Sequence, residues 1–117
     1  MITGVHAIVY TTNPDADRVF FADVLGLESV DAGGGWLIFQ LPPAELATHP
    51  DARGDRYELY LMCDDVALTA RELQAQGVEL IGDVSDEGWG VLTTIKLPGG
   101  GKLGLYEPRH ASPLNTR

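Results

Sequence analysis

Glu58 is the side chain whose position in this sequence most directly suggests chemistry. It stands between Tyr57 and Leu59 in an apolar run, and a carboxylate there is unusual unless that face of the strand is exposed or used. Burial would raise its pKa and suit it to act as a general base. The alternative is a carboxylate at the edge of a cavity, paired with Arg53 or Arg56.

Aromatic side chains and one methionine form a second group of candidates. On the predicted strands they fall on the faces turned away from the helices, where they would line a partly apolar pocket with hydroxyl groups. Such a pocket suits a small aromatic or carbonyl compound, and the alternative is ordinary core packing. Trp89, between two glycines, is either a wall against a planar ligand or a loop anchor. The set is Tyr10, Tyr60, Met62, Trp89 and Tyr106.

Other common chemistries find no support in the sequence. It has no G-x-S-x-G elbow and no paired C-x-x-C motif, so serine hydrolases and zinc ribbons are disfavoured. Neither glycine triplet, 33–35 or 99–101, stands between a strand and a helix as a phosphate-binding loop requires. Cys63 is expected on the helix-facing side of its strand, as an inert buried thiol.

The composition restricts the class of protein. A length of 117 residues favours one compact domain with its own core. The net charge is −9, from 8 basic against 17 acidic residues, which disfavours nucleic-acid and anionic-membrane partners. One cysteine permits no intrachain disulfide, and no apolar run has membrane-spanning length. We therefore expect a soluble cytoplasmic protein without a signal peptide.

The N-terminal half reads as one helix among four strands. Asn13 is a good N-cap and Pro14 suits the first helical position, so we predict a helix from there to about Leu25, ended by Gly26. Alternation and β-branched residues predict strands at Val5–Tyr10, 27–31, 36–41 and 44–49.

The same order restarts after a polar linker over 51–56. Tyr57–Cys63 is a predicted strand, and Asp64 or Asp65 can cap a helix over 66–76 that Gly77 ends. Further strands are predicted at 78–81, 91–97 and 102–107.

The chain is thus an internal duplication of roughly 50 residues, β-α-β-β-β twice. Gly26-Leu27-Glu28 matches Gly77-Val78-Glu79, and Leu41-Pro42 matches Leu97-Pro98. We divide a single domain, 1–117, into modules at about 1–50 and 57–108 and a loose tail at 109–117. One helix cannot cover both faces of a sheet, so two halves or two chains must combine, and the curved sheets would enclose a cavity.

The sequence resembles the vicinal oxygen chelate superfamily, which includes glyoxalase I, extradiol dioxygenases and bleomycin-resistance proteins. Four pieces carry the resemblance: the strand with His6, the FFADVLGL segment at 20–27, the strand entering Asp64-Asp65-Val66, and LPGGG at 97–101. The resemblance implies an α+β fold of tandem βαβββ modules. It does not select an activity, because this fold hosts many reactions.

The resemblance also implies a metal site. Metal-dependent members hold a divalent ion with ligands from the first and last strands of each half, and the ion acts as a Lewis acid on vicinal oxygens. By position, His6 fills the first slot and Glu58 the third, while His49 or Glu45 fills the second. The ion would be Ni, Fe, Mn, Co or Zn.

The fourth ligand slot departs from the family pattern. Gly104 stands where a glutamate is expected, and Glu107, three residues later, should point to the opposite face unless a bulge re-aims it. A three-ligand set of His6, Glu58 and either His49 or Glu107 is one hypothesis, and no metal at all is the other.

Two functions follow. One is a metal-dependent lyase of the glyoxalase I type or a dioxygenase, in which His6 and Glu58 hold the ion or move a proton on a substrate with vicinal oxygens. The alternative is a metal-free protein that binds an aromatic or drug-like small molecule. In either case we expect a homodimer whose cavity is formed within a chain or across the dimer.

Overall fold

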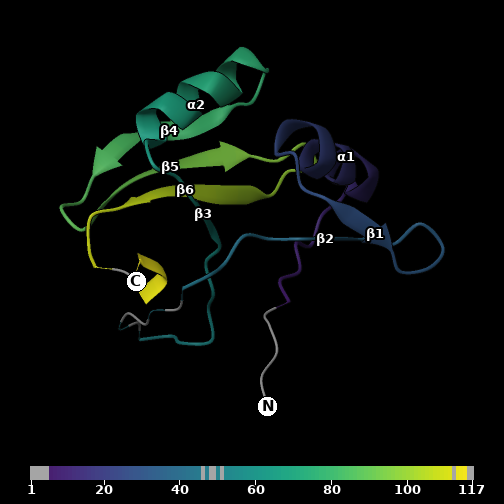
Figure 1. Cartoon of the computed structure of the whole chain (residues 1–117), viewed down its shortest axis with the longest axis horizontal. Coiled ribbons are helices and arrows are strands. Elements are labelled where there is room, and N and C mark those ends of the chain that lie inside the picture. The colour runs from purple at the N-terminus through teal and green to yellow at the C-terminus, as the bar shows by residue number, and fades with distance from the viewer. Residues whose placement is uncertain (1–5, 46, 48–49, 51, 112, 116–117) are drawn as a thin grey trace.

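The computed structural model describes residues 6–45, 47, 50, 52–111 and 113–115. It has a helix beside a two-stranded sheet in the N-terminal half and a helix over a four-stranded sheet in the C-terminal half (Figure 1). The fold class is α+β, as predicted. No helix within the described ranges is long and apolar enough to cross a bilayer.

Local signals in the sequence explain the N-terminal helix. α1 spans Pro14–Val19, and the Asn13 side chain accepts a hydrogen bond from the Ala16 N–H (3.2 Å). The helix continues as a wider π-helical turn, η1, over Phe20–Val24. The chain then turns at Gly26, whose φ of +69° is a conformation that glycine adopts without strain. The cap, the proline and the glycine lie where the sequence predicts them.

A short antiparallel hairpin completes this half. β1, Ser29–Asp31, pairs with β2, Leu37–Phe39. The Asp31 carboxylate accepts from the N–H groups of Gly33 (2.8 Å) and Gly35 (3.3 Å), which closes the glycine-rich turn.

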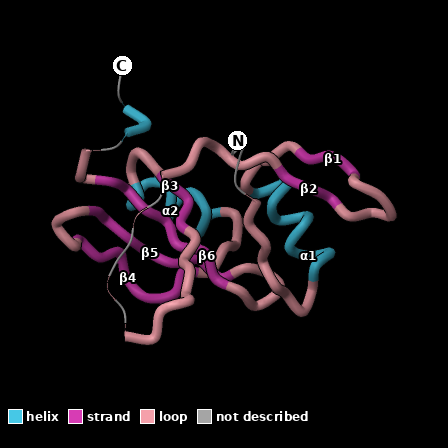
Figure 2. The backbone as a smooth tube through the Cα atoms, turned by 90° about the horizontal axis from the view of Figure 1, so that it is seen from below, coloured by secondary structure: helices cyan, strands magenta, loops and turns pink. Residues whose placement is uncertain are grey.

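The C-terminal half is a mixed sheet with strand order β3-β6-β5-β4 (Figure 2). β3 is Tyr60–Met62, and it runs parallel to β6, Lys102–Pro108. β5, Gly90–Lys96, is antiparallel to β6 and to β4, Leu80–Asp86. α2, Val66–Ala75, is capped by Asp65, which accepts from the Leu68 N–H (3.0 Å).

The core lies between α2 and one face of this sheet. Val66, Ala70 and Leu73, spaced four and three residues apart, are the buried residues of α2. They face alternate residues of β5 and β6, and Phe20 of η1 joins the same cluster. The sheet residues of this core are Val91, Ile95, Leu97, Leu103 and Leu105.

Asp17 connects the two halves. Its carboxylate is 2% exposed, and one oxygen accepts the Gly99 N–H at 2.7 Å. The Thr12 hydroxyl donates to the Gly99 carbonyl (2.9 Å). A side chain at position 99 would collide with the Thr11 hydroxyl and approach Asp17 to 2.8 Å. Glycine is therefore required where α1 meets the turn between β5 and β6.

Two predicted strands of the N-terminal half, Val5–Tyr10 and 44–49, fall partly outside the described residues. The described residues 6–10 are not part of a strand, and Ile8 and Tyr10 are 62% and 88% exposed. In the predicted strand 44–49, positions 44, 45 and 47 are irregular, whereas 46, 48 and 49 lie outside the described residues. Prolines on both sides of 44–49 donate no backbone N–H, which weakens pairing there.

Four other strands differ in length from their predictions, and β1 and β2, of 3 residues each, are shorter than the predicted strands 27–31 and 36–41. β3 is shorter than the predicted Tyr57–Cys63, since residues 57–59 are exposed and lie outside the strand, although the Leu59 carbonyl accepts the Gly104 N–H at 3.1 Å. β4 runs on to Asp86, past the predicted end at Ile81, through an irregularity between Ile81 and Ser85 where Gly82 has a φ of +77°.

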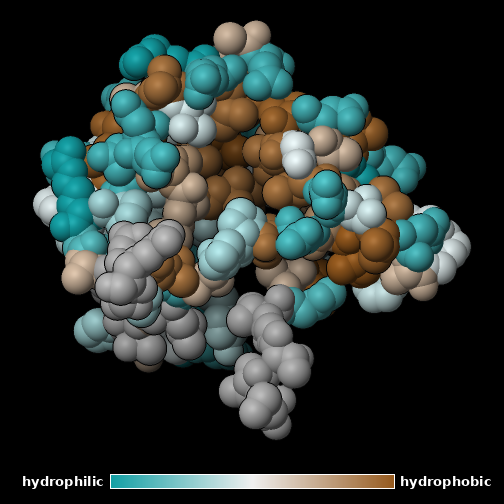
Figure 3. Space-filling view, viewed as in Figure 1, coloured by the Kyte–Doolittle hydropathy of each residue, from teal (hydrophilic) through white to brown (hydrophobic). Residues whose placement is uncertain are grey.

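The molecule is open rather than closely packed. Its accessible surface is 8784 Å², against about 6,200 Å² for a monomer of this mass. Its radius of gyration is 15.2 Å, against about 13 Å for a compact chain of this length. Figure 3 shows hydrophobic surface between the two helices, over β5 and β6, and another patch over the β1–β2 hairpin.

Candidate functional site

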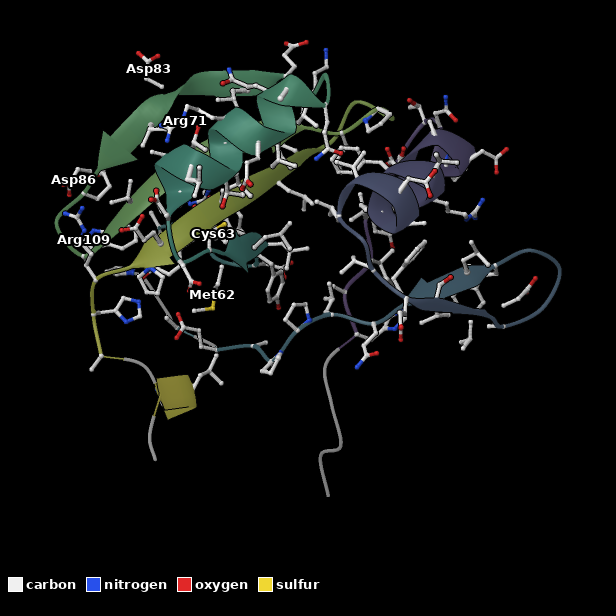
Figure 4. All side chains as sticks on the ribbon, turned by 45° about the horizontal axis from the view of Figure 1, so that its top comes forward. Met62, Cys63, Arg71, Asp83, Asp86 and Arg109 are labelled. Atoms are coloured by element: carbon white, nitrogen blue, oxygen red, sulfur yellow. The ribbon has the colours of Figure 1, made fainter. Side chains whose placement is uncertain are left out.

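The sheet face that α2 leaves uncovered carries most of the predicted pocket residues. Successive residues of a strand point to opposite faces, so Tyr60 and Met62 lie on this open face while Leu61 packs toward the core. Figure 4 shows Met62 and Cys63 on opposite sides of the chain. Cys63 is half-buried against the core and burial raises its thiol pKa, whereas the inertness of the thiol stays a prediction.

Two glycines in the strands make room for two tyrosine rings on this face. The Tyr60 ring lies directly over Gly104 of β6, where any Cβ would overlap it. The Tyr106 ring lies in the same way over Gly90 of β5. Glycine within a strand often marks such a close approach.

Three rings pack around the ring of Tyr106. We call the four side chains Tyr60, Trp89, Tyr106 and His110 the Tyr106 cluster. Ring centroids lie 6.0 Å from Tyr106 for Tyr60, 5.8 Å for Trp89 and 5.6 Å for His110. These distances are typical of attractive aromatic pairs. Tyr106 is 9% exposed, whereas Tyr60 and Trp89 are 37% and 46% exposed and form the outer part of the cluster.

Two carboxylates border the cluster. Glu58 accepts a hydrogen bond from the Tyr60 hydroxyl at 3.3 Å and lies 3.8 Å from the Arg56 guanidinium. Glu45 lies 3.6 Å from Nε2 of His110. Burial, and then the charge of Glu58, raise the pKa of Tyr60, while burial and Glu45 raise that of Tyr106. Both phenols therefore remain neutral donors at physiological pH.

The turn that carries Trp89 is braced by β6. Arg109 donates its backbone N–H to the Trp89 carbonyl (3.0 Å), and its guanidinium donates to the Asp86 carboxylate (2.7 Å). Figure 4 shows the Arg109 and Asp86 side chains pointing toward each other. The hydrogen bond from Gly88 and then the Arg109 charge hold the pKa of Asp86 below its usual value.

The predicted metal ligands are described only in part. His6 and Glu58 are exposed, and His49 lies outside the described residues. Glu107 is on the helix-covered face, because β6 has no bulge, and its carboxylate accepts the Val66 N–H at the start of α2 (2.9 Å). Within the described ranges, no three side chains of histidine, cysteine, aspartate or glutamate are placed to hold a metal ion.

The remaining features lie apart from the cluster. Tyr10, a predicted pocket residue, is 88% exposed in the segment before α1. An open depression of about 300 Å³ lies on the β1–β2 hairpin. Its described lining residues are Glu28, Ser29, Val30, Ile38, Phe39 and Gln40.

Several solved structures share this architecture over nearly their whole length. Lactoylglutathione lyase from Agrobacterium tumefaciens matches with a TM-score of 0.65 at 18% identity, covering 90% of this chain and 92% of that one. TnmS3, an antibiotic binding protein from a Streptomyces species, matches with a TM-score of 0.60 at 23% identity, covering 89% and 99%. A member of the glyoxalase/bleomycin resistance protein/dioxygenase superfamily from Sphaerobacter thermophilus matches with a TM-score of 0.65 at 20% identity, covering 91% and 98%.

The chain has the glyoxalase/bleomycin resistance/dioxygenase fold. The resemblance predicted from the sequence is confirmed at the level of the fold. No protein-family model and no curated protein sequence matches the chain. A likeness of this kind describes architecture, and the activity must be argued from the site.

Within this fold, the slot of the fourth metal ligand is taken by an aromatic ring. Gly104 offers no donor, and the Tyr60 ring occupies the space that a side chain there would enter. Glu107 is engaged by the N-terminus of α2, on the other face of the sheet. The described residues of the glyoxalase/bleomycin resistance fold in this chain therefore do not fit the four-ligand metal site.

Sequence reasoning identified Tyr60, Trp89 and Tyr106 but missed His110. The three were found because strand alternation and a glycine-flanked turn place them on one side. His110 follows the last strand, where no periodicity applies, and its contacts depend on how the chain turns after Pro108. Glu45 was considered as a metal ligand or as part of a plain surface strand, whereas the structure places it beside His110.

Proposed function

We propose that this protein binds a planar aromatic small molecule at the Tyr106 cluster, without a metal ion. The observation that carries the proposal is the pair of tyrosine rings seated on Gly90 and Gly104. Glycine at both positions lets the two rings pack on the strands, and at Gly104 the Tyr60 ring occupies the position where a metal site would need a donor. The half-exposed Tyr60 and Trp89 rings offer stacking surface to a ligand.

The surroundings of the cluster support binding rather than bond breaking. Glu58 is exposed and shares its charge with Arg56 and the Tyr60 hydroxyl, so it is not placed as a buried general base. TnmS3, a structural neighbour that covers 89% of this chain, is itself an antibiotic binding protein. That neighbour supports the class of function and not the identity of the ligand.

A binding experiment with two probes of one skeleton tests the proposal. We would titrate the Trp36→Phe protein, in which Trp89 is the sole tryptophan, with 9-aminoacridine and with anthracene-9-carboxylate, after treatment with EDTA. We expect at least one probe to quench the fluorescence of Trp89. Tyr60→Ala should lower the affinity for that probe about fivefold, because one stacking contact is lost.

Tyr57→Ala is the matched control, since Tyr57 is 90% exposed and lies before β3. It should leave the affinity of the probe unchanged. The proposal fails if neither probe quenches Trp89, or if Tyr60→Ala and Tyr57→Ala have the same effect.

A metal-dependent lyase or dioxygenase remains the second candidate. It is favoured by the likeness to lactoylglutathione lyase and by the exposure of His6 and Glu58. Elemental analysis after separate addition of Ni, Fe(II), Mn, Co and Zn decides between the two. Near-stoichiometric metal that is lost in Glu58→Gln would replace the binding proposal with the enzyme.

We also propose that two copies associate. The surface of 8784 Å² exceeds that of a compact monomer by about 2,600 Å², which is enough for a stable dimer interface. Much of the exposed apolar surface belongs to the N-terminal half, at Ile8, Tyr10, Val19, Val30 and Trp36. The single cysteine supports the cytoplasm as the proposed compartment.

A further inference from the structure

Tyr106 has no ring face free for a ligand in this conformation. It is 9% exposed, its ring lies over the Gly90 backbone, and three other rings surround it. A ligand that stacks on Tyr106 must therefore displace one of its neighbours. We expect the displaced neighbour to be the ring whose movement breaks the fewest strand and turn contacts.

Tyr60 and Trp89 are held by the sheet. Tyr60 belongs to β3 and pairs with Gly104 of β6. The carbonyl of Trp89 accepts a hydrogen bond from Arg109, and the turn is tied again through Asp86. Moving either ring would break strand or turn contacts.

His110 is held more weakly. It follows the end of β6 at Pro108, in an exposed part of the chain. The contacts of its ring are the stack on Tyr106, Nε2 beside Glu45 at 3.6 Å, and Nδ1 beside the neighbouring Ala111 carbonyl at 2.7 Å. Rotation of the His110 side chain moves its ring off Tyr106 without breaking any strand pairing or the contacts of Arg109 with Trp89 and Asp86.

The contacts of the His110 ring also indicate which kind of ligand could replace it. Its ring is inclined by 31° to Tyr106, closer to parallel than Tyr60 at 58° or Trp89 at 53°. One edge of this flat, chargeable ring faces the half-buried Glu45 carboxylate. A planar aromatic cation would satisfy the same stack and the same carboxylate.

We propose that the His110 ring occupies the position of the ligand in the free protein, and that the ligand is a planar aromatic cation that displaces His110 from Tyr106 and Glu45. This inference rests on the proposed function and names its ligand class. The net charge of −9 favours the approach of a cation over that of an anion. His110 then acts as a built-in competitor that lowers the apparent affinity for the ligand.

The two probes, in the Trp36→Phe protein, test this directly. 9-Aminoacridine is a planar three-ring cation, and anthracene-9-carboxylate has three rings of the same size with the opposite charge. We expect the cation to bind more tightly. We expect His110→Ala to raise its affinity about tenfold, because the competing stack on Tyr106 and the contact with Glu45 are removed. His110→Phe, which keeps a ring on Tyr106, should raise it much less.

The role of Glu45 is tested in the His110→Ala background. Glu45→Gln should lower the affinity of 9-aminoacridine about fivefold and leave that of anthracene-9-carboxylate unchanged or higher. Glu72→Gln removes the same charge from the exposed surface of α2. It should alter neither affinity, which separates a local contact from the effect of net charge.

Two outcomes overturn the inference while sparing the proposed function. One is unchanged or reduced cation affinity in His110→Ala, and the other is an anion that binds as tightly as the cation, provided that Tyr60→Ala still weakens binding. If neither probe quenches Trp89 in any variant, both the proposed function and the inference fall.

Discussion

Single residues at this site act mainly through the space they leave. Gly104 matters because it has no side chain, and the Tyr60 ring fills that space. Asp17 matters because its side chain is present, since the buried carboxylate fills the junction between the halves. One of its oxygens has no hydrogen-bond partner among the described residues. Small changes in side-chain size at such positions lower the stability of the protein, because the neighbouring groups are closely packed and cannot shift to make room.

Gly104→Ala tests most directly whether the Tyr60 ring packs on the backbone of Gly104. The new methyl group would overlap the Tyr60 ring, so we expect a loss of about 1–3 kcal/mol in the free energy of unfolding and weaker binding of the planar probe. Chemical denaturation and Trp89 quenching measure the two effects.

Gly101→Ala is the control for this substitution. A Cβ at position 101 meets Leu97 at 3.6 Å and Val9 at 3.8 Å, which are ordinary contacts. If the two alanine variants are equally stable and bind the probe equally well, the Tyr60 ring is not seated as described.

At the scale of elements, the turn between β4 and β5 is a clamped unit. Asp86 at the end of β4 accepts from both Gly88 and Arg109, and Arg109 also holds the Trp89 carbonyl. The clamp joins the first residue after β6 to the turn that presents Trp89, so strand ends far apart in sequence fix one ring.

Acid should release this clamp. The pKa of Asp86 is lower in the folded protein than its ordinary 3.8, with the Gly88 hydrogen bond as the largest cause. The contribution of Asp86 to stability is therefore present above pH 3.8 and is lost as the pH falls through the folded-state value. We expect the emission of Trp89, in the Trp36→Phe protein, to shift as the pH is lowered below about 4.

Asp86→Asn should show the shifted emission already at neutral pH, because the ion pair with Arg109 is absent. Asp83→Asn, on the same strand and exposed, should behave like the parent protein. Identical emission of Asp86→Asn and its parent across the whole pH range would contradict the clamp.

The sequence predicted elements best where a local signal decides them. Asn13, Pro14 and Asp65 begin helices as expected, and the open face of β3 follows from alternation. The prediction was wrong where pairing depends on distant residues, as in positions 6–10, which find no strand partner. The cluster was predicted only in part, because the stack of His110 on Tyr106 is a tertiary contact with no periodic pattern.

On the scale of the whole molecule, the open arrangement of the two halves predicts a partner. The hairpin β1–β2 is a two-stranded sheet to which no other strand of the described residues pairs, and a sheet of this size is marginal on its own. A second copy would cover this hairpin and the surface between the helices that Figure 3 displays.

Light scattering should give about twice the chain mass of 12.6 kDa. Val30→Asp, which puts a charge on the exposed hairpin, should shift the protein toward the monomer. Val84→Asp, at an exposed position on β4, serves as the control. A monomer at every concentration would refute the association.

The contact between Asp17 and Gly99 also imposes an order on biosynthesis. Asp17 and Thr12, which bind Gly99, are synthesised 82 and 87 residues before it. A nascent chain can form α1 but cannot dock it on the Gly99 turn until that turn has been made, so the apolar surface of α1 stays exposed in the meantime. Stalled or clipped chains that end before Gly99 would expose this surface, and they should be the forms that chaperones retain.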